Sequence, residues 1–318
     1  MLKKIFITLL CAVTAFSAYA NRDITVGNYD SVAKNWSWPV YSCPDYPTSI
    51  AMSNDGKIIT ACGGDEAGIS RSIDAGKNWE QYEREYKPTE VTVSGDGKTI
   101  AAIADKSIIL SIDGVKGWAI KKCSKTLSAI AISYDGKTIA AIQKGQIIIS
   151  SDGGGTWSKP SNYGLSAVTV SGDGKTIAAL KDKSVIISMD SGITWSTLSH
   201  KCYHTPTSIS MSKDGSVIAI TEKKKTYGNE GVVIISLDAG KHWNVAHECK
   251  YTPTAAAVSN NGQSIAVFEH KRVDVTHDEQ IIILSTNTGE DWNTIDVDHY
   301  CSSTFAMNGV DTAIASII

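Results

Sequence analysis

A short turn pattern, Ser-x-Asp-Gly, recurs along the chain at intervals of 38 to 49 residues, and this period constrains the fold more than any other feature. Its copies begin at Ser53, Ser94, Ser133, Ser171, Ser212 and Ser259 (with Asn for Asp in the last), and a degenerate seventh copy begins at Asn308. Asp-Gly between short β-branched runs indicates a hairpin, because Gly takes the positive φ of a tight turn. A repeat of this length predicts one repetitive architecture rather than the two domains suggested by 318 residues.

A second pattern, Ser-x-Asp-x-Gly-x-x-Trp, alternates with the first. Its acidic or amide positions are Asp74, Asp113, Asp152, Asp190, Asp238 and Asn287, and its aromatic positions are Trp79, Trp118, Trp157, Trp195, Trp243 and Trp292. The Asp side chain can accept backbone N–H groups within a turn, and the Trp can bury its ring against the neighbouring repeat. Both are therefore predicted to be structural. The pattern resembles the Asp box, or BNR repeat, of sialidase-like, sortilin-like and photosystem II assembly-factor-like propellers.

Short apolar runs such as 107–110 and 146–149 lie between the two patterns and are typical of buried strands. Four strands in about forty residues predict an all-β fold, a seven-bladed β-propeller of four-stranded blades. The last repeat lacks its outer half, which residues 24–26 and Trp36 are expected to supply by pairing with the C-terminal hairpin. The predicted domain spans residues 21–318, with blades at about 43–82, 83–121, 122–160, 161–199, 200–246, 247–296, and 297–318 plus 21–42.

Residues 1–20 have the order of a secretory signal peptide: Lys3 and Lys4, then an apolar stretch, then Ala18-Tyr19-Ala20. We therefore expect an exported protein, periplasmic or extracellular, without a membrane span and monomeric. Removing this segment changes the net charge from −3 to −5, since it holds two Lys and no acid (28 − 33). A mildly acidic mature chain lacks the excess of positive charge that is typical of nucleic-acid-binding proteins.

Binding residues are expected on the propeller face that carries the B–C loops and D–A connections, because the turn patterns occupy the other face. Its longer loops are 62–68, 222–231 and 269–280. We therefore expect a binding site on the part of this face formed by blades 5–7 and 1. The charged candidates in these loops are Lys223, Lys224, Lys225, Asp274, Asp278 and Glu279. Solvated surface charge is the alternative interpretation of the same residues.

Cysteines and histidines share a repeat position, in the pattern His-x-Cys: His200 with Cys202, His247 with Cys249, and His299 with Cys301. In an exported protein such cysteines favour disulfides, and we predict Cys202–Cys249 and Cys43–Cys301. This pairing assumes that the cysteines lie near the axis, where inner strands converge. The alternative is a zinc or copper site, since residues two apart in an extended segment present their N and S ligands on one side. No other cofactor is predicted.

The sequence contains no set of catalytic residues that predicts a particular reaction. It has four Arg (Arg22, Arg71, Arg84 and Arg272), whereas the resemblance to sialidases would require three that converge on a carboxylate. We therefore predict a non-enzymatic binding or scaffold propeller that recognises a protein or peptide. The alternative is a carbohydrate-binding or glycoside-hydrolase-like protein, for which Glu222, Glu230, Asp278 and Glu279 are candidate acids.

Overall fold

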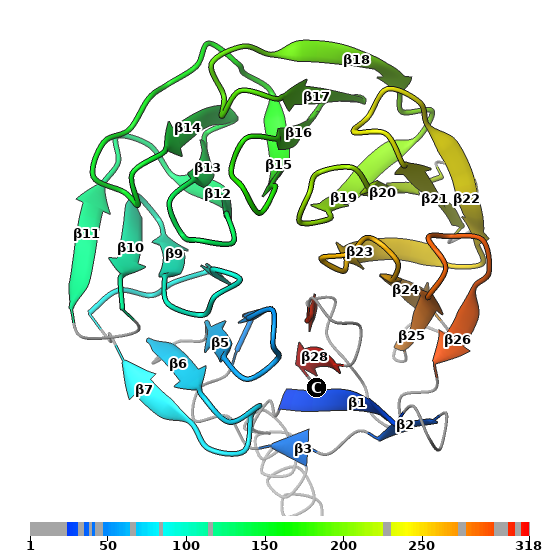
Figure 1. Ribbon diagram of the computed structural model, residues 1–318, viewed down its shortest axis with the longest axis horizontal. Helices are drawn as coiled ribbons and strands as arrows, with labels where there is room; N and C mark the ends of the chain where they lie inside the picture. Colours follow the sequence, from blue (N-terminus) through cyan, green and yellow to red (C-terminus); the bar gives the residue numbers. More distant parts are fainter. Residues whose placement is uncertain are drawn as a thin grey trace, which may run out of the picture.

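The computed structural model describes residues 24–30, 35–37, 40–41, 47–63, 68–82, 85–113, 117–224, 230–272, 278–295, 305–308 and 313–317. Their strands form seven antiparallel sheets, here called blades 1 to 7, that stand around a central axis (Figure 1). In blades 1 to 6 consecutive strands are neighbours, and we name them A to D from the axis outward. The predicted all-β propeller is therefore confirmed.

Blade 1 contains β4 (Ser49–Met52), β5 (Ile59–Cys62), β6 (Ile69–Ser72) and β7 (Glu80–Tyr82); blade 2 contains β8 (Glu90–Val93), β9 (Ile100–Ala104), β10 (Ser107–Ser111) and β11 (Trp118–Lys122). Blade 3 contains β12 (Leu127–Ile132), β13 (Ile139–Gln143) and β14 (Gln146–Ser150); blade 4 contains β15 (Leu165–Val170), β16 (Ile177–Lys181), β17 (Ser184–Ser188) and β18 (Ser196–Lys201). Blade 5 contains β19 (Thr205–Met211), β20 (Ile218–Lys223), β21 (Gly231–Ser236) and β22 (Asn244–Cys249); blade 6 contains β23 (Thr252–Val258), β24 (Ile265–Arg272), β25 (Asp278–Ser285) and β26 (Asn293–Ile295).

Blade 7 joins the two ends of the described chain. Its inner strands are β27 (Phe305–Met307) and β28 (Ala313–Ile317), and its outer strands are β1 (Ile24–Asp30) and β2 (Asn35–Ser37). Strands β1 and β28 pair antiparallel over five residues and lie side by side in Figure 1. A further strand, β3 (Val40–Tyr41), also pairs with β1. The N-terminal strand thus occupies the place that the sequence predicted for it.

Blade 3 departs from the predicted four strands. Its sheet has three strands, and at the outer position only one isolated bridge forms, between Ile149 and Ser158. Pro160 follows two residues later. Proline has no backbone N–H to donate, so a strand cannot continue through this point with regular ladder bonds.

The second and third strands of blades 1 to 6 form the core. Every residue of β9 and β10 is buried, because neighbouring blades cover both faces of the sheet. In blades 2 to 6 the Trp of the C–D turn packs at the boundary between two blades: Trp157 contacts a cluster that includes Leu110 of blade 2 and Ile148 of blade 3. Trp118, Trp195, Trp243 and Trp292 pack against equivalent clusters at other boundaries. Each of these five Trp therefore joins its blade to the preceding one.

Hydrogen bonds inside the turns explain the repeated residues. In blade 1, Ser72 Oγ donates to Asp74 Oδ1 and accepts from Gly76 N, both at 2.8 Å. Asn78 N donates to Asp74 Oδ1 and Trp79 Nε1 donates to Gly76 O, again at 2.8 Å. Equivalent bonds recur in blades 3 to 6. In blade 2, Asp113 precedes residues 114–116, which lie outside the described part of the chain.

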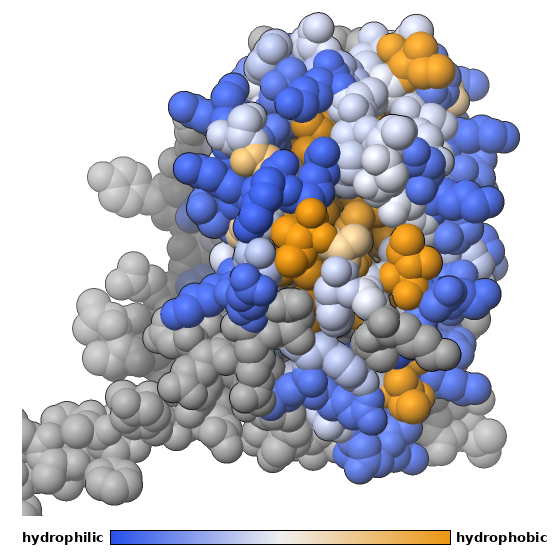
Figure 2. All heavy atoms as spheres, turned by 90° about the vertical axis from the view of Figure 1, so that its left-hand side faces the viewer, coloured by the Kyte–Doolittle hydropathy of each residue, from blue (hydrophilic) through white to orange (hydrophobic). Residues whose placement is uncertain are grey.

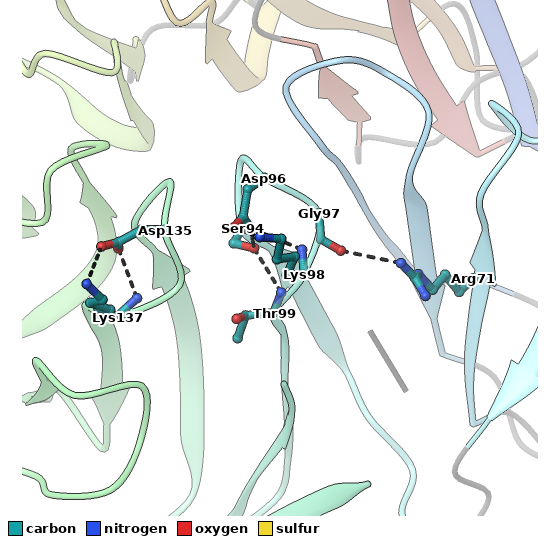
Figure 3. Close-up of polar contacts among 8 residues, drawn as sticks. All are labelled: Arg71, Ser94, Asp96, Gly97, Lys98, Thr99, Asp135 and Lys137. Atoms are coloured by element: carbon teal, nitrogen blue, oxygen red, sulfur yellow. Dashed lines mark hydrogen bonds and ion pairs between the residues drawn. The ribbon is translucent and has the colours of Figure 1, made fainter. Parts of the chain in front are cut away.

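The A–B turns use a similar device (Figure 3). Asp96 accepts a hydrogen bond from Lys98 N at 3.0 Å, and Ser94 Oγ accepts one from Thr99 N at 2.9 Å. Arg71 of blade 1 donates to Gly97 O at 3.4 Å and so links adjacent blades. Because the C–D turn also bonds to the A–B turn of its own blade, as Gly153 N does to Lys137 O, both turns lie on one face. We call this the turn face and the opposite one the loop face.

Candidate functional site

The charged binding candidates predicted in the long loops of the loop face lie partly outside the described residues. Lys225 and Asp274 fall outside them, and the side chains of Asp278 and Glu279 in β25 are not described. Lys223 is exposed at the end of β20. Lys224 Nζ forms ion pairs with Glu248 at 2.5 Å and Glu230 at 3.8 Å. Of these two described lysines, Lys224 is therefore charge-paired within blade 5 and Lys223 is an exposed charge.

The predicted Cys202–Cys249 disulfide is wrong, because both residues are free cysteines. Cys249 ends the outer strand β22, and Cys202 directly follows the outer strand β18. The predicted blade boundaries placed them on inner strands, where neighbouring blades approach most closely. At the outer ends, each thiol instead contacts a glutamate of the following blade, Cys202 with Glu222 and Cys249 with Glu269. Cys43 and Cys301 lie outside the described residues.

One His-x-Cys pair meets a buried carboxylate at the junction of blades 4 and 5. The ligand atoms of His200, Cys202 and Glu222 all lie within 4.8 Å of one another. His200 comes from the end of β18, Cys202 from the D–A connection and Glu222 from the end of β20. We call these three residues the His200 cluster. Glu222 is 0% and Cys202 1% exposed, whereas His200 is partly buried, so the cluster is enclosed on all sides except that of the imidazole.

The carboxylate of Glu222 accepts bonds from two sides. His200 Nε2 lies 3.3 Å from Oε1, and His204 N donates to Oε2 at 2.9 Å. Burial alone would raise the pKa of Glu222, but the bonds from His200, His204 and Cys202 outweigh it and hold that pKa below its usual value. Burial, followed by the neighbouring Glu222, raises the pKa of Cys202 to about 12. The cluster therefore pairs an ionised carboxylate with a protonated thiol.

The junction of blades 5 and 6 repeats these residue types with one contact missing. Tyr251 N donates to Glu269 Oε2 at 3.1 Å, as His204 N does to Glu222. The imidazole of His247 packs on Trp292 at 5.2 Å between ring centroids, as that of His200 packs on Trp243. Among the described side chains, however, no ion pair joins His247 to Glu269, whose Oε1 has no hydrogen-bond partner. Burial accordingly raises the pKa of Glu269.

The two described His-x-Cys pairs therefore do not come together at one metal site, as the predicted three-pair site requires. In the part of the chain that the structure describes, the candidate metal-binding group contains His200 and Cys202 but neither His247 nor Cys249. His299 and Cys301 fall outside the described residues. The expectation that one His-x-Cys presents N and S together is met at His200 and Cys202. The third ligand, the carboxylate of Glu222, is not part of the His-x-Cys pattern, so the sequence analysis did not connect it with this site.

A second feature, on the turn face, was missed by the sequence reasoning. A cavity of about 140 Å³ lies at the axis, where the A strands meet their A–B turns. Its rim contains the second residue of the Ser-x-Asp-Gly turn in blades 1 to 6: Asn54, Gly95, Tyr134, Gly172, Lys213 and Asn260. Its wall contains Met52, Val93, Ile132, Val170, Met211 and Met307. The signal was present in the sequence, since this is the position of the turn pattern whose residue type varies most from blade to blade.

Backbone hydrogen bonds between blades fix this rim. Tyr134 N donates to Gly172 O at 3.1 Å, Gly172 N to Lys213 O at 2.7 Å and Lys213 N to Asn260 O at 3.0 Å. The side chains of Asn260 and Asn54 are also hydrogen-bonded. Lys213 reaches past Gly172 so that its Nζ lies 3.5 Å from the Tyr134 ring centre. A Cβ on Gly172 would approach Lys213 Cγ to 2.4 Å, so glycine is required for this arrangement.

Hydrophobic residues recur at the outer edge of the same face. Ile73, Ile112, Met189 and Leu237, each the second residue of a C–D turn, are 50–62% exposed. Seen from the side, hydrophobic residues form small groups separated by hydrophilic ones (Figure 2). Within the described residues, no helix has the length and apolar character of a membrane-spanning segment.

Comparison with known proteins identifies the fold. No protein-family model matches the chain, and no curated protein matches it. The crystal structure of an ancestral GH74 enzyme superposes with a TM-score of 0.59 at 14% identity, over 85% of this chain and 43% of that one. YCF48 from Cyanidioschyzon merolae superposes with a TM-score of 0.59 at 12% identity, over 86% of this chain and 96% of that one. The chain thus spans less than half of the GH74 enzyme, and both likenesses show a β-propeller fold.

Proposed function

We propose that this protein is an exported, non-enzymatic propeller that binds a protein or peptide partner at the axial cavity of its turn face. The observation that carries the proposal is the rim itself. Repeated Ser, Asp (Asn in blade 6) and Gly residues build six equivalent turns, while the most variable position of each turn faces a shared cavity. Variation within a fixed frame is typical of a recognition surface on a rigid scaffold.

The cavity has the size and lining of a pocket for one partner side chain. Its volume of about 140 Å³ is close to that of an engineered cavity that admits benzene. Three methionines, Met52, Met211 and Met307, are among the lining residues, and their flexible side chains can adapt to the shape of a partner group. Asn54, Lys213 and Asn260 supply polar groups at the entrance.

Glycoside hydrolysis is the second candidate function, favoured by the likeness to the GH74 enzyme. It requires two carboxyl groups across a cleft. The described residues that line the axial cavity include no Asp or Glu. Of the candidate acids, Glu222 is fully buried within the His200 cluster and Glu230 pairs with Lys224. The geometry therefore favours binding over hydrolysis.

Site-specific photo-crosslinking tests the proposal and the choice of face. A photoreactive phenylalanine analogue replaces Tyr134 on the turn face or, as a matched control, the exposed Tyr203 on the loop face. We expect a discrete crosslinked partner from position 134 and none from 203. Tyr134→Ala and Lys213→Ala should then weaken that partner's binding at least tenfold, whereas Tyr203→Ala should not.

Two outcomes would contradict this assignment. Crosslinking from position 203 alone would move the site to the loop face. Turnover of a fluorogenic glycoside that Glu230→Gln abolishes would favour the enzyme.

A further inference from the structure

Beyond partner binding, we propose that His200, Cys202 and Glu222 form a zinc-binding site at the junction of blades 4 and 5. The proposal rests on this cluster and is independent of the axial cavity. Three different ligand types meet here: an imidazole nitrogen and a thiol sulfur from the His-x-Cys segment at the end of blade 4, and a carboxylate oxygen from β20 of blade 5. Zinc accepts this mixture of ligands in proteins.

The separations fit a tetrahedral ion. Bonds of about 2.0 Å from zinc to nitrogen and to oxygen place two tetrahedral ligands roughly 3.3 Å apart. His200 Nε2 and Glu222 Oε1 are 3.3 Å apart, and all three ligand atoms lie within 4.8 Å of one another. A small movement of the thiol toward the pair would complete three positions, and the fourth would be left for water or a further ligand.

The surroundings hold the ligands in place. Glu222 Oε2 accepts a hydrogen bond from His204 N at 2.9 Å, which orients the carboxylate and leaves Oε1 directed at His200. The His200 ring is packed at 5.2 Å from that of Trp243. Cys202 N donates to Lys183 O at 2.8 Å, which fixes the backbone that carries the thiol. Outer contacts of this kind set ligand orientation in metal sites.

Binding releases one proton in a balanced step. The thiol of Cys202 loses its proton to solvent as sulfur bonds to the ion, while Glu222 is already ionised and neutral imidazole donates its lone pair. The thiolate and carboxylate then supply two negative charges to Zn²⁺. No oxidant or reductant is required.

Cobalt titration of the purified, chelator-treated and reduced protein tests the proposal, because Co²⁺ bound to a thiolate absorbs in the near ultraviolet. We expect one equivalent of Co²⁺ to produce this absorption and Zn²⁺ to abolish it. Cys202→Ser should remove the thiolate absorption. The matched control Cys249→Ser, at the equivalent position of the next junction, should retain it.

Glu222→Gln provides a second test that leaves the thiol in place. It should weaken zinc binding by more than the roughly 10- to 100-fold typical of outer-sphere changes. Thermal unfolding of each variant separates loss of a ligand from loss of the fold. The proposal is wrong if the unaltered protein gives no cobalt–thiolate absorption, or if Cys249→Ser rather than Cys202→Ser removes it.

Discussion

The junctions on either side of blade 5 contain nearly the same residues but differ in electrostatics. Both bring a cysteine at the end of an outer strand to a buried glutamate of the next blade, and both stack a histidine on a tryptophan. Only His200 also contacts its glutamate, and the pKa of Glu222 is lowered while that of Glu269 is raised. The contact with histidine thus distinguishes a buried glutamate whose pKa is lowered from one at the equivalent position whose pKa is raised.

The largest expected effect comes from removing the histidines. In metal-free protein, His200→Ala leaves the buried Glu222 carboxylate without its main partner and should cost about 3 kcal/mol of unfolding free energy. His247→Ala loses mainly its contact with Trp292 and should cost about 1 kcal/mol. Urea unfolding at pH 7 with a chelator measures both. Equal losses would remove the distinction between the junctions.

A smaller effect is expected in the pH dependence of stability. Because the pKa of Glu222 is lowered on folding, its contribution is present above its unfolded value of about 4.3 and is lost as the pH falls below it. Because the pKa of Glu269 is raised, this group contributes most at low pH and loses stability as the pH rises above about 4.3. Glu222→Gln should therefore be most harmful at pH 7, and Glu269→Gln most harmful at pH 4.

Unfolding free energies of the two variants, measured against the unaltered protein from pH 3.5 to 7.5, check this opposition. Differences of order 1 kcal/mol are expected across the range. Parallel pH profiles for the two variants would show that the junctions titrate alike.

The smallest expected difference is in thiol reactivity. Burial raises the pKa of all three thiols, but less for the half-buried Cys123, which should therefore react with iodoacetamide at least about tenfold faster than Cys202 or Cys249. Peptide mass spectrometry after timed alkylation of the native protein measures the three rates. A Cys202–Cys249 disulfide peptide in the unreduced digest would contradict the structure of both junctions.

The fold was predictable because its determinants are local and repeated. Asp-Gly turns, the C–D turn hydrogen bonds and the boundary Trp each act within a few residues or on the adjacent blade, so the sequence pattern reports them directly. Blade 3 was mispredicted because Pro160 removes a donor at a position where the repeat period alone expects a strand.

The candidate sites were less predictable because they depend on where strands end. Strands β18 and β22 extend to Lys201 and Cys249, which moves the cysteines from the predicted inner strands to the outer ends. Glu222 lies twenty residues after Cys202 in the sequence. The two meet because blade 5, which carries Glu222 on β20, packs beside the outer end of blade 4, where Cys202 lies. The axial rim, by contrast, could have been found from the most variable position of the turn pattern.

Two double-mutant cycles test the central comparison most directly, since they isolate the energy of one contact from the packing around it. One cycle combines His200→Ala with Glu222→Gln, and the other combines His247→Ala with Glu269→Gln, both in metal-free protein at pH 7. We predict a coupling energy of about 2 kcal/mol for the first pair and less than about 0.5 kcal/mol for the second. Couplings of equal size would contradict the account.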